Sequence, residues 1–476
     1  MSKSFHDAKI TYISDLSCYY FDFFQYFCIQ ILKYEYILYI IMRKLLSMAV
    51  LMAAATNTFA QSGTNSPYSQ LGLGQLSEQA SGFNRGMNGL AYGFHEHNQI
   101  NHMNPASYSQ LDSLTFIFDM GMSGQKTNFK EGGRKINANN ADFEYAVAGF
   151  RAFKHVGVSF GILPYTNVGY NYSVSQDLDA TGSMSCLNTY NGTGGLHVVY
   201  LGAGWEPVKG FSIGANVGYL WGNYIRTVVN SYTNTYANSL TKRYSAEVRN
   251  YKLDFGAQYT TRLSKKDELT VGVTYSLGHD IGGKPMLEIV STNSQTGVAD
   301  TTNYPLKGQE EMKLAIPHSI GAGFMYNHNN KVKVGFDYNL QKWASVSFPV
   351  YKADATPEQS YVMSDNAFKD RHKFTLGTEI CPEEDSRSFI KRIKYRAGVS
   401  YVTPYLNIDG GDGPKELSAS FGFGIPIMNS YNSRSILNIS AQWVNMKCNR
   451  FVTENTFRIN IGLTFNERWF AKWKVE

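Results

Sequence analysis

The chain has 476 residues, a net charge of +6 at pH 7, 33 Tyr and 29 Phe. Because this mild positive charge includes no long Lys/Arg block and no basic stripe interleaved with aromatic residues, the composition argues against a nucleic-acid partner. The cysteines of residues 61–476, Cys186, Cys381 and Cys448, form no CxxC motif and no even set. Neither a zinc site nor a disulfide scaffold is therefore predicted.

The first 60 residues are interpreted as an upstream extension followed by an export signal. Arg43 and Lys44 precede an apolar run at 45–55, and Ala60 ends a short segment of the kind that signal peptidase cleaves. This pattern predicts a signal peptide at 42–60, with residues 1–41 lying upstream of the true start at Met42. The alternative is a membrane anchor made of 29–41 and 45–55, in which Arg43 and Lys44 would lie at costly depths in the bilayer.

Residues 61–113 show neither strand nor helix periodicity and are rich in Gly, Asn and Ser. A segment with so little apolar surface cannot build a core of its own. Its length suits folding back into a space enclosed by the strands that follow. We interpret residues 61–113 as an N-terminal plug, or hatch.

About fourteen segments then alternate between apolar and polar residues. In the last of them Phe457, Ile459 and Ile461 alternate with polar or small residues that include Arg458 and Asn460. A two-residue period gives a strand one apolar and one polar face. The predicted strands lie near 114–123, 142–151, 155–172, 194–204, 211–230, 245–260, 268–280, 313–326, 332–348, 371–380, 393–402, 417–425, 436–446 and 456–465.

The connectors between these strands are short and long in turn. Those at 152–154, 206–210, 261–267 and 327–330 are tight, whereas those at 173–193, 231–244, 281–312 and 349–370 are long and polar. In an up-and-down barrel every second connector lies on the same side of the membrane, which explains the sorting, whereas a soluble sandwich gives no reason for it. The sequence thus predicts an all-β, transmembrane antiparallel barrel of about 14 strands at 114–465 in a bacterial outer membrane. An even strand count places both termini in the periplasm.

Two bulk properties agree with a barrel. The mean hydropathy of -0.29 is no objection, since lumen-facing polar residues offset lipid-facing apolar ones. The aromatic fraction of 14% suits the aromatic girdles of such barrels. After the last strand, the tail at 466–476 is aromatic and basic, which suits the membrane interface or contact with a partner.

Three stretches carry a family resemblance. The triplet Asn104-Pro105-Ala106 precedes the first strand, the run 157–170 contains Leu-Pro-Tyr, and the run 316–343 carries Pro, Gly, Tyr, Asp and Trp in succession over one hairpin. By their order and position they resemble the outer-membrane transporters of long-chain fatty acids and aromatic hydrocarbons, the FadL/TodX/OmpP1 family, over essentially all of 61–476. The Gly, Tyr and Asn usage would fit a Bacteroidetes member.

The resemblance implies a fourteen-stranded barrel, plugged by a hatch that carries the Asn104-Pro105-Ala106 motif, which passes hydrophobic molecules sideways through a gap in its wall. Pro164 lies within the predicted third strand, close to Gly161. Because proline cannot donate to a strand ladder, Pro164 and Gly161 are the candidates for that opening. The alternative is that Pro164 lies past the paired zone, at the base of an outer loop.

The predicted function is passive uptake of hydrophobic small molecules, long-chain fatty acids or aromatic hydrocarbons, by a monomer in outer-membrane lipid. It requires no cofactor, nucleotide or metal, and the residues that bind ligand are not identified by the sequence; Arg458 and Asn460 are candidates for the lumen face only. The alternative is an interaction protein that serves protein secretion as a cargo carrier, as related barrels of the Bacteroidetes do, with secretion-machinery partners.

Enzymatic readings are weaker. Ser159 and Ser212 lie in Gly-x-Ser-x-Gly patterns, but a nucleophile elbow needs a sharp turn from strand to helix, whereas both lie inside predicted strands. His95, His97 and His102 with Glu96 could ligate a metal, yet no regular element fixes them. We predict a non-enzyme, with an outer-membrane phospholipase as the enzymatic alternative.

Overall fold

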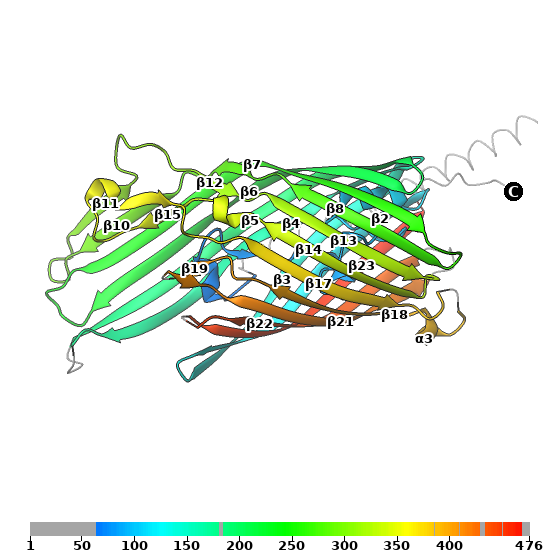
Figure 1. The fold of residues 1–476 in the computed structure, drawn as a ribbon. Helices are drawn as coiled ribbons and strands as arrows, with labels where there is room; N and C mark the ends of the chain where they lie inside the picture. The colour runs from blue at the N-terminus through cyan, green and yellow to red at the C-terminus, as the bar shows by residue number, and fades with distance from the viewer. Residues whose placement is uncertain are drawn as a thin grey trace, which may run out of the picture. The chain divides into compact units, whose positions relative to one another are not determined.

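The computed structural model describes residues 63–179, 184–384, 386–408, 410–428, 434–449 and 451–468, without the side chains of 358, 428, 434 and 468. The predicted extension (1–41), the signal peptide (42–60) and most of the tail (469–476) lie outside these residues. Figure 1 shows the arrangement of the described elements.

Fourteen antiparallel strands close into a barrel, as the sequence predicts. Each strand pairs with the next along the chain, and the last pairs with the first over 16 residue pairs from Thr115 opposite Arg468 to Lys130 opposite Thr453. The barrel strands are β2 (Thr115–Glu131), β3 (Arg134–Phe153), β4 (Val156–Asp177), β5 (Ser185–Val208), β6 (Phe211–Tyr232), β7 (Ser239–Arg262), β8 (Asp267–Ser276), β13 (Ser319–His328), β14 (Val332–Gln341), β17 (Arg371–Ile380), β18 (Lys394–Val402), β21 (Lys415–Met428), β22 (Arg434–Lys447) and β23 (Thr453–Arg468).

The alternation of residue types decides which side chains face outward. In β23, Phe457, Ile459 and Ile461 are 52%, 45% and 50% exposed, whereas the alternate residues Asn460 and Thr464 are buried in the lumen. Similar outward-facing apolar residues occur on the other strands and form an apolar belt around the wall. Such a belt is stable only where lipid rather than water covers it.

The two rims of the barrel differ as the connector lengths predict. At one rim the strands are joined by turns of a few residues, such as Asn329-Asn330, whose φ values of 55° and 56° are those of a tight hairpin that asparagine tolerates. At the other rim the hairpins are long, and Figure 1 shows them extending past the rest of the barrel.

The long connectors are largely strand, which the sequence does not predict. β4 and β5 pair without a break from Thr166 opposite Leu196 to Asp177 opposite Ser185, through most of the predicted connector at 173–193. β6 and β7 likewise extend through most of 231–244, to Tyr232 and from Ser239. Beyond the apolar belt both faces of a strand meet water, so polar residues occupy both faces and the two-residue period disappears.

Two further strands widen this extension. β10 (Met286–Thr292) pairs with β7, and β11 (Ala299–Tyr304) pairs with β10. Together with the extended parts of β4 to β7 they form what we call the outer sheet. The remaining elements at the long-hairpin rim are β9 (His279–Gly282) with β12 (Leu314–Ile316), η3 (Trp343–Ser345), β15 (Phe348–Tyr351) with β16 (Tyr361–Ser364), η4 (Pro357–Gln359) and β19 (Asn407–Ile408) with β20 (Gly411–Asp412).

Three predicted strands are too long. Of the predicted strands 268–280, 313–326 and 332–348, only the parts that form β8, β13 and β14 belong to the barrel. Pro317 separates β12 from β13, and η3 begins at Trp343 after the end of β14. Proline interrupts a ladder because it lacks an N–H. At the short-turn rim the connector 381–393 contains α3 (Phe389–Arg392). Among the described residues, no helix has the length and apolar character needed to cross a membrane.

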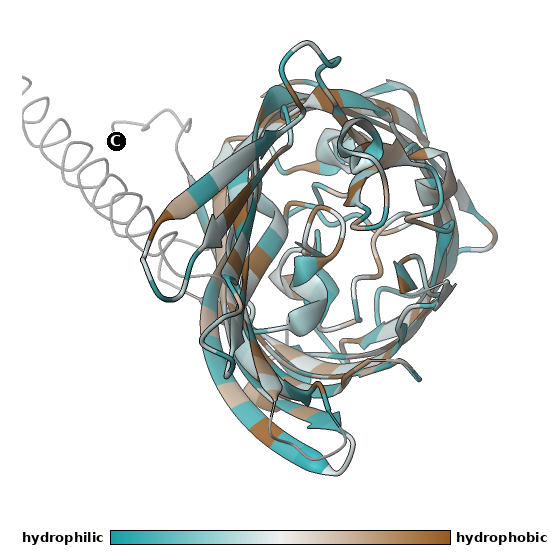
Figure 2. Cartoon of the chain, turned by 90° about the vertical axis from the view of Figure 1, so that its left-hand side faces the viewer, coloured by the Kyte–Doolittle hydropathy of each residue, from teal (hydrophilic) through white to brown (hydrophobic). Residues whose placement is uncertain are grey.

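Residues 63–113, here called the leading segment, lie inside the barrel and comprise η1 (Pro67–Gln70), β1 (Gln75–Leu76), α2 (Gly82–Arg85) and η2 (Pro105–Gln110). Figure 2, viewed from the long-hairpin rim, shows loops and a short helix within the ring of strands. η2 packs on β5, β6 and β7, and α2 packs on β22 and β23. Phe83 and Met87 of this segment are fully buried. The glycines on the lumen face permit this close packing, since a Cβ at Gly272 would lie 1.8 Å from the carbonyl oxygen of Tyr92.

Candidate functional site: the lumen cavity and the wall seam

A cavity of about 250 Å³ lies between the leading segment and the barrel wall. We call it the lumen cavity. Part of its lining is apolar and part is charged. The apolar lining includes Leu76, Leu163, Val198, Ile316 and Met446, and the charged lining includes Glu78, Asp142, Glu144, Lys252, Asp254, Arg371, Lys373, Glu416 and Arg458. A space with two kinds of wall suits a molecule with an apolar body and a polar end.

Most charges around the cavity are neutralised locally. Lys252 pairs with Asp254, and Glu78 of the leading segment lies 4.0 Å from both Lys373 and Arg458. Arg371, in contrast, has no ion pair within the part of the chain that the structure describes. It is therefore the cation in this lining that is best able to pair with an anionic group of a ligand.

The wall is incompletely paired beside the cavity. β3 and β4 pair only from Phe153 opposite Val156 to Ala146 opposite Ile162. Beyond that point no pair between the described residues of the two strands continues the ladder, although β4 stays paired with β5 as far as Asp177. We call the facing edges, residues 134–145 of β3 and 163–177 of β4, the wall seam.

The leading segment occupies part of this seam. β1 pairs antiparallel with β4, with Gln75 opposite Asn167 and Leu76 opposite Thr166. The backbone N–H of Ser77 also donates to the carbonyl oxygen of Tyr165 at 3.1 Å. Residues 75–77 of the leading segment thus satisfy part of an edge that would otherwise present free backbone donors and acceptors.

Gly161 and Pro164, the candidates for a wall opening, flank the point where pairing ends. Gly161 lies opposite Val147 in the last paired stretch, and a Cβ there would lie 2.5 Å from the carbonyl oxygen of Ala146. Pro164 lies opposite His197, and the register of β4 against β5 shifts between Pro164 and Thr166. Against β5 the proline thus lies at a bulge within the paired strand, whereas against β3 it lies two residues past the last pair, and the role of both residues in an opening is a proposal.

The triplet Asn104-Pro105-Ala106 fixes the leading segment to the wall at β5, β6 and β7, the strands that follow β4. Asn104 caps η2 by accepting from the N–H of Ala106 at 3.2 Å, and its Nδ2 donates to the carbonyl oxygen of Tyr92 at 2.8 Å. A Cβ at Gly256 would lie 2.1 Å from Asn104 Oδ1. The motif therefore anchors a turn against a glycine of β7.

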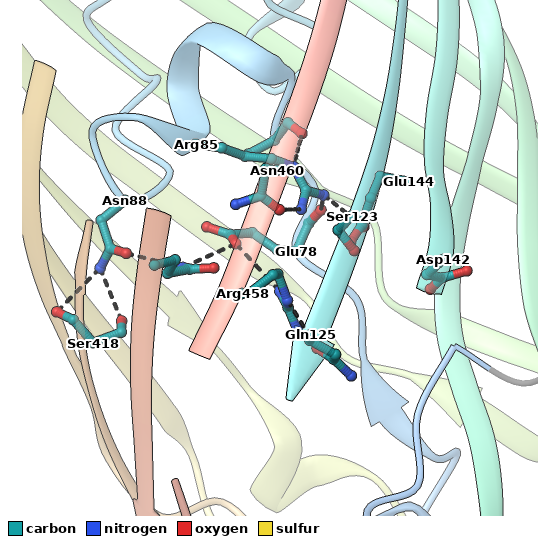
Figure 3. Close-up of polar contacts among 12 residues, drawn as sticks. Glu78, Arg85, Asn88, Ser123, Gln125, Asp142, Glu144, Ser418, Arg458 and Asn460 are labelled. Atoms are coloured by element: carbon teal, nitrogen blue, oxygen red, sulfur yellow. Dashed lines mark hydrogen bonds and ion pairs between the residues drawn. The ribbon is translucent and has the colours of Figure 1, made fainter. Parts of the chain in front are cut away.

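A buried ion pair joins α2 to the wall near the cavity. Arg85 Nη2 lies 2.8 Å from Glu144 Oε2 of β3, and their side chains are 1% and 8% exposed. Arg85 also donates to Asn460 Oδ1 at 3.2 Å, and Glu144 accepts from Ser123 at 2.5 Å (Figure 3). Arg458 donates to Gln125 at 2.9 Å, so both Arg458 and Asn460 face the lumen, as the alternation predicts.

A second set of buried charged side chains fixes the leading segment to the wall, at a level closer to the short-turn rim. Glu96 binds Lys333 of β14, and it also accepts from Lys394 of β18 at 3.2 Å. Asp337 of β14 accepts from the backbone N–H groups of Ala91 and Tyr92 at 2.6 and 2.9 Å. The leading segment is therefore fixed to the wall by charge-assisted bonds as well as by apolar packing.

The sequence alone did not single out Arg85, Glu78 or Glu96 as anchoring residues. The available signal was their rarity, because residues 61–113 contain only four Asp, Glu, Lys or Arg side chains. A charge in a segment destined for the lumen must find a partner there, since leaving it buried and unpaired is costly. The identity of that partner depends on the barrel register.

His97 and Asp112 form a partly exposed hydrogen-bonded pair in the leading segment. This pair predicts that the stability of the segment depends on pH. His97 Nδ1 lies 2.7 Å from Asp112 Oδ2, and this hydrogen bond raises the pKa of His97. Because the folded-state pKa is raised, the stabilisation is fully present below the ordinary histidine pKa and is lost as pH rises through the raised value. NMR titration of labelled histidine should give a lower pKa for His97 in Asp112→Asn, and an unchanged pKa would contradict the pairing.

The residues considered for chemistry have structural contacts. Ser159 Oγ bonds the Tyr200 hydroxyl at 2.9 Å, and Ser212 accepts from Ser109 at 2.8 Å. Both serines lie inside strands rather than at an elbow. Among the residues of the described ranges, no group of three or more His, Cys, Asp or Glu side chains is arranged to hold a metal.

Solved structures with this fold include a hydrocarbon channel, a toluene transporter and a FadL homologue. A CymD monoaromatic hydrocarbon channel is 14% identical, with 84% of this chain and 100% of that chain covered and a TM-score of 0.55. The Ralstonia pickettii toluene transporter TbuX is 12% identical, with 82% and 98% covered and a TM-score of 0.52. A Pseudomonas aeruginosa FadL homologue is 12% identical, with 82% and 99% covered and a TM-score of 0.56. At these identities the likeness establishes the fold alone, and it agrees with the FadL/TodX resemblance.

No curated protein matches the sequence. A family model described as BamG matches residues 41–476. This family name differs from the one that the sequence motifs suggest, although the barrel is of the FadL type. Since the match extends over most of the sequence, the chain belongs to the BamG family.

Proposed function

We propose that this protein lies in the bacterial outer membrane and mediates passive uptake of hydrophobic small molecules, which enter the lumen cavity and leave sideways through the wall seam. Long-chain fatty acids and aromatic hydrocarbons are the substrate classes that the proposal names. The apolar belt supports the membrane location, and the long hairpins would face outward with the short turns in the periplasm.

One observation carries the proposal: the cavity lies against both edges of the seam. Glu144 of β3 and Leu163 of β4 line the cavity, and β1 lies between them with Gln75 and Leu76 also in the lining. A molecule in the cavity is therefore separated from the seam by only two residues of paired strand. A short displacement of β1 would open a sideways path.

The ligand chemistry follows from the lining and its surroundings. Above the cavity, an apolar cluster that includes Leu73, Val168, Leu196 and Trp343 fills the lumen towards the long hairpins. An apolar molecule entering from outside would meet this cluster first and the charged wall later. Arg371 would then pair with a carboxylate head, while an uncharged hydrocarbon would use the apolar wall alone.

The mechanism requires no chemical step. Movement follows the concentration gradient, and the barrier is the displacement of β1 together with the leading segment. Uptake is tested with a fluorescent long-chain fatty acid in cells that express the protein and in matched cells without it. Expression should raise the initial rate, whereas equal rates in both cell lines would contradict the proposal.

Replacing Pro164 with valine should reduce uptake by about fivefold. Valine supplies a backbone N–H two residues beyond Ile162, where the β3–β4 ladder ends, and extending that ladder by one bond would stabilise the closed wall by about 1 kcal/mol, which lowers the open population accordingly. The initial uptake rate is the measurement. Pro426→Val, at a proline inside β21 away from the seam, is the matched control and should leave the rate unchanged. Unaltered uptake in Pro164→Val would count against a role for this residue in the opening.

A second candidate function, an interaction protein that serves secretion, is favoured by the outer sheet. This sheet exposes Val174 and Leu187, both 45% exposed, and the turn between β6 and β7 exposes Tyr236, which is 81% exposed. The sheet is rich in Tyr, Ser, Asn and Thr. Surfaces of that composition commonly bind other macromolecules. If the protein co-purifies with secretion machinery while the uptake rate does not change with expression, the second candidate replaces the first.

A further inference from the structure

Four lysines form a row across the wall at the long-hairpin rim. Lys130 of β2 lies directly opposite Lys135 of β3, and Lys415 of β21 lies directly opposite Lys447 of β22. Strand β23 lies between β2 and β22 and relates the two lysine pairs. Its residue Thr453 lies opposite Lys130, and the neighbouring residue Glu454 lies opposite Met446, the residue before Lys447. The two lysine pairs therefore lie at the same level of the wall. We call Lys130, Lys135, Lys415 and Lys447 the lysine row.

The lysine row faces away from the lumen. Residues an even number apart on a strand share a face. Lys130 is four residues from Lys126, which lies opposite the outward-facing Phe457. Lys447 is four residues from Trp443, which also lies opposite Phe457. Trp443 and Phe457 belong to the apolar belt, with exposures of 42% and 52%. All four lysines are exposed. The row therefore lies on the same face as the belt, beyond its outer edge.

Among the described residues, no acidic side chain lies on this face of the four strands between the belt and the row. The positions between row and belt are occupied by Asn128, Asn137, Asn445 and Asn455, whereas Glu416 and Glu454 alternate to the lumen side. Within the described part of the chain, none of the four lysines has an ion pair. Asp412 is the acidic group near Lys415, and it already binds Lys369 at 2.5 Å.

Like charges placed directly opposite each other on neighbouring strands are unfavourable, since their Cβ atoms lie only about 5 Å apart. The fold contains two such pairs in one row.

Four residues of strand correspond to about 14 Å along the strand, or about 10 Å along the membrane normal for strands tilted by about 40°. This height beyond the aromatic residues is within reach of the lipid headgroup layer for a flexible lysine side chain.

We propose that the lysine row binds the phosphate groups of phosphorylated lipids in the outer leaflet. The inference rests on the membrane orientation stated in the proposed function, not on uptake. A phosphate between two facing lysines removes their repulsion and replaces it with attraction on both sides. Because Lys130 and Lys135 lie on the hairpin that carries the β3 edge, bound lipid would lie next to the wall seam.

The test is a lipid titration of the detergent-solubilised full chain, followed by native mass spectrometry. The variant K130Q/K135Q/K415Q/K447Q is compared with K154Q/K209Q/K265Q/K331Q, which removes four exposed lysines from the short turns at the opposite rim. The probes are lipid A with its phosphates, the same lipid without phosphates, and inorganic phosphate.

We expect the row variant to bind phosphorylated lipid A at least about tenfold more weakly than the unaltered protein, and the opposite-rim variant to bind it equally well. Binding of the dephosphorylated lipid should not depend on the row. Equal lipid A binding by both variants would overturn the proposal, as would saturation by inorganic phosphate at the same concentration. A protein that remains monomeric in water without detergent would instead refute the membrane location on which both proposals rest.

Discussion

A disulfide between β1 and β4 should abolish uptake. Gln75 and Asn167 lie directly opposite each other, so the variant Gln75→Cys/Asn167→Cys can form a bond that fixes β1 in the wall seam. If substrate leaves where β1 now lies, the oxidised protein should show only the background rate of cells without it. Reduction should restore uptake. The measurement is the initial uptake rate before and after reductant, in a background without Cys186, Cys381 and Cys448.

The matched control is a disulfide that joins two strands already fully paired. Asn445 and Asn455 lie opposite each other in β22 and β23, and their side chains are hydrogen-bonded at 2.7 Å. Asn445→Cys/Asn455→Cys should therefore transport equally well when oxidised and when reduced. Unchanged uptake in the oxidised β1–β4 variant would show that the seam is not the exit.

Removing the Arg85 side chain should release the leading segment from the wall. In Arg85→Ala the Glu144 carboxylate stays buried without its partner, which costs about 3–5 kcal/mol and corresponds to a change of about 10²–10⁴-fold in the docking equilibrium. The segment should become sensitive to protease, and reconstituted protein should conduct ions more often. Cleavage rates within residues 63–113 in detergent measure the effect.

The double variant Arg85→Met/Glu144→Gln separates lost charge pairing from lost packing. Removing both charges together leaves no unpaired ion, so most of the protease resistance should return. If Arg85→Ala is as resistant as the unaltered protein, the ion pair does not hold the segment. If the double variant is as sensitive as Arg85→Ala, the loss is due to packing.

The barrel could be predicted from sequence because its signal is local. A two-residue period such as Phe457, Ile459 and Ile461 results directly from one face meeting lipid and the other meeting a filled lumen. The same reasoning explains where the prediction ended. The outer parts of β4 and β5 meet water on both faces, so they lack the period and the sequence predicts connectors there.

The candidate site could be predicted only in part, because it depends on register. Pro164 was identifiable from the missing N–H of proline, yet the pairing of β1 with Thr166 and Asn167 leaves no mark in the sequence. Arg85 and Glu144 are 59 residues apart, and only the closed barrel brings them together. The lysine row likewise appears only once Lys130 is placed opposite Lys135 and Lys415 opposite Lys447.

The most direct test of the account is a crystal structure of the protein with a brominated long-chain fatty acid. Anomalous scattering locates the bromine atoms without ambiguity. The account predicts bromine peaks in the lumen cavity between Leu163 and Met446, with the carboxylate towards Arg371, and a further peak at the wall seam. Bromine peaks confined to the outer apolar belt, with none inside the barrel, would contradict it.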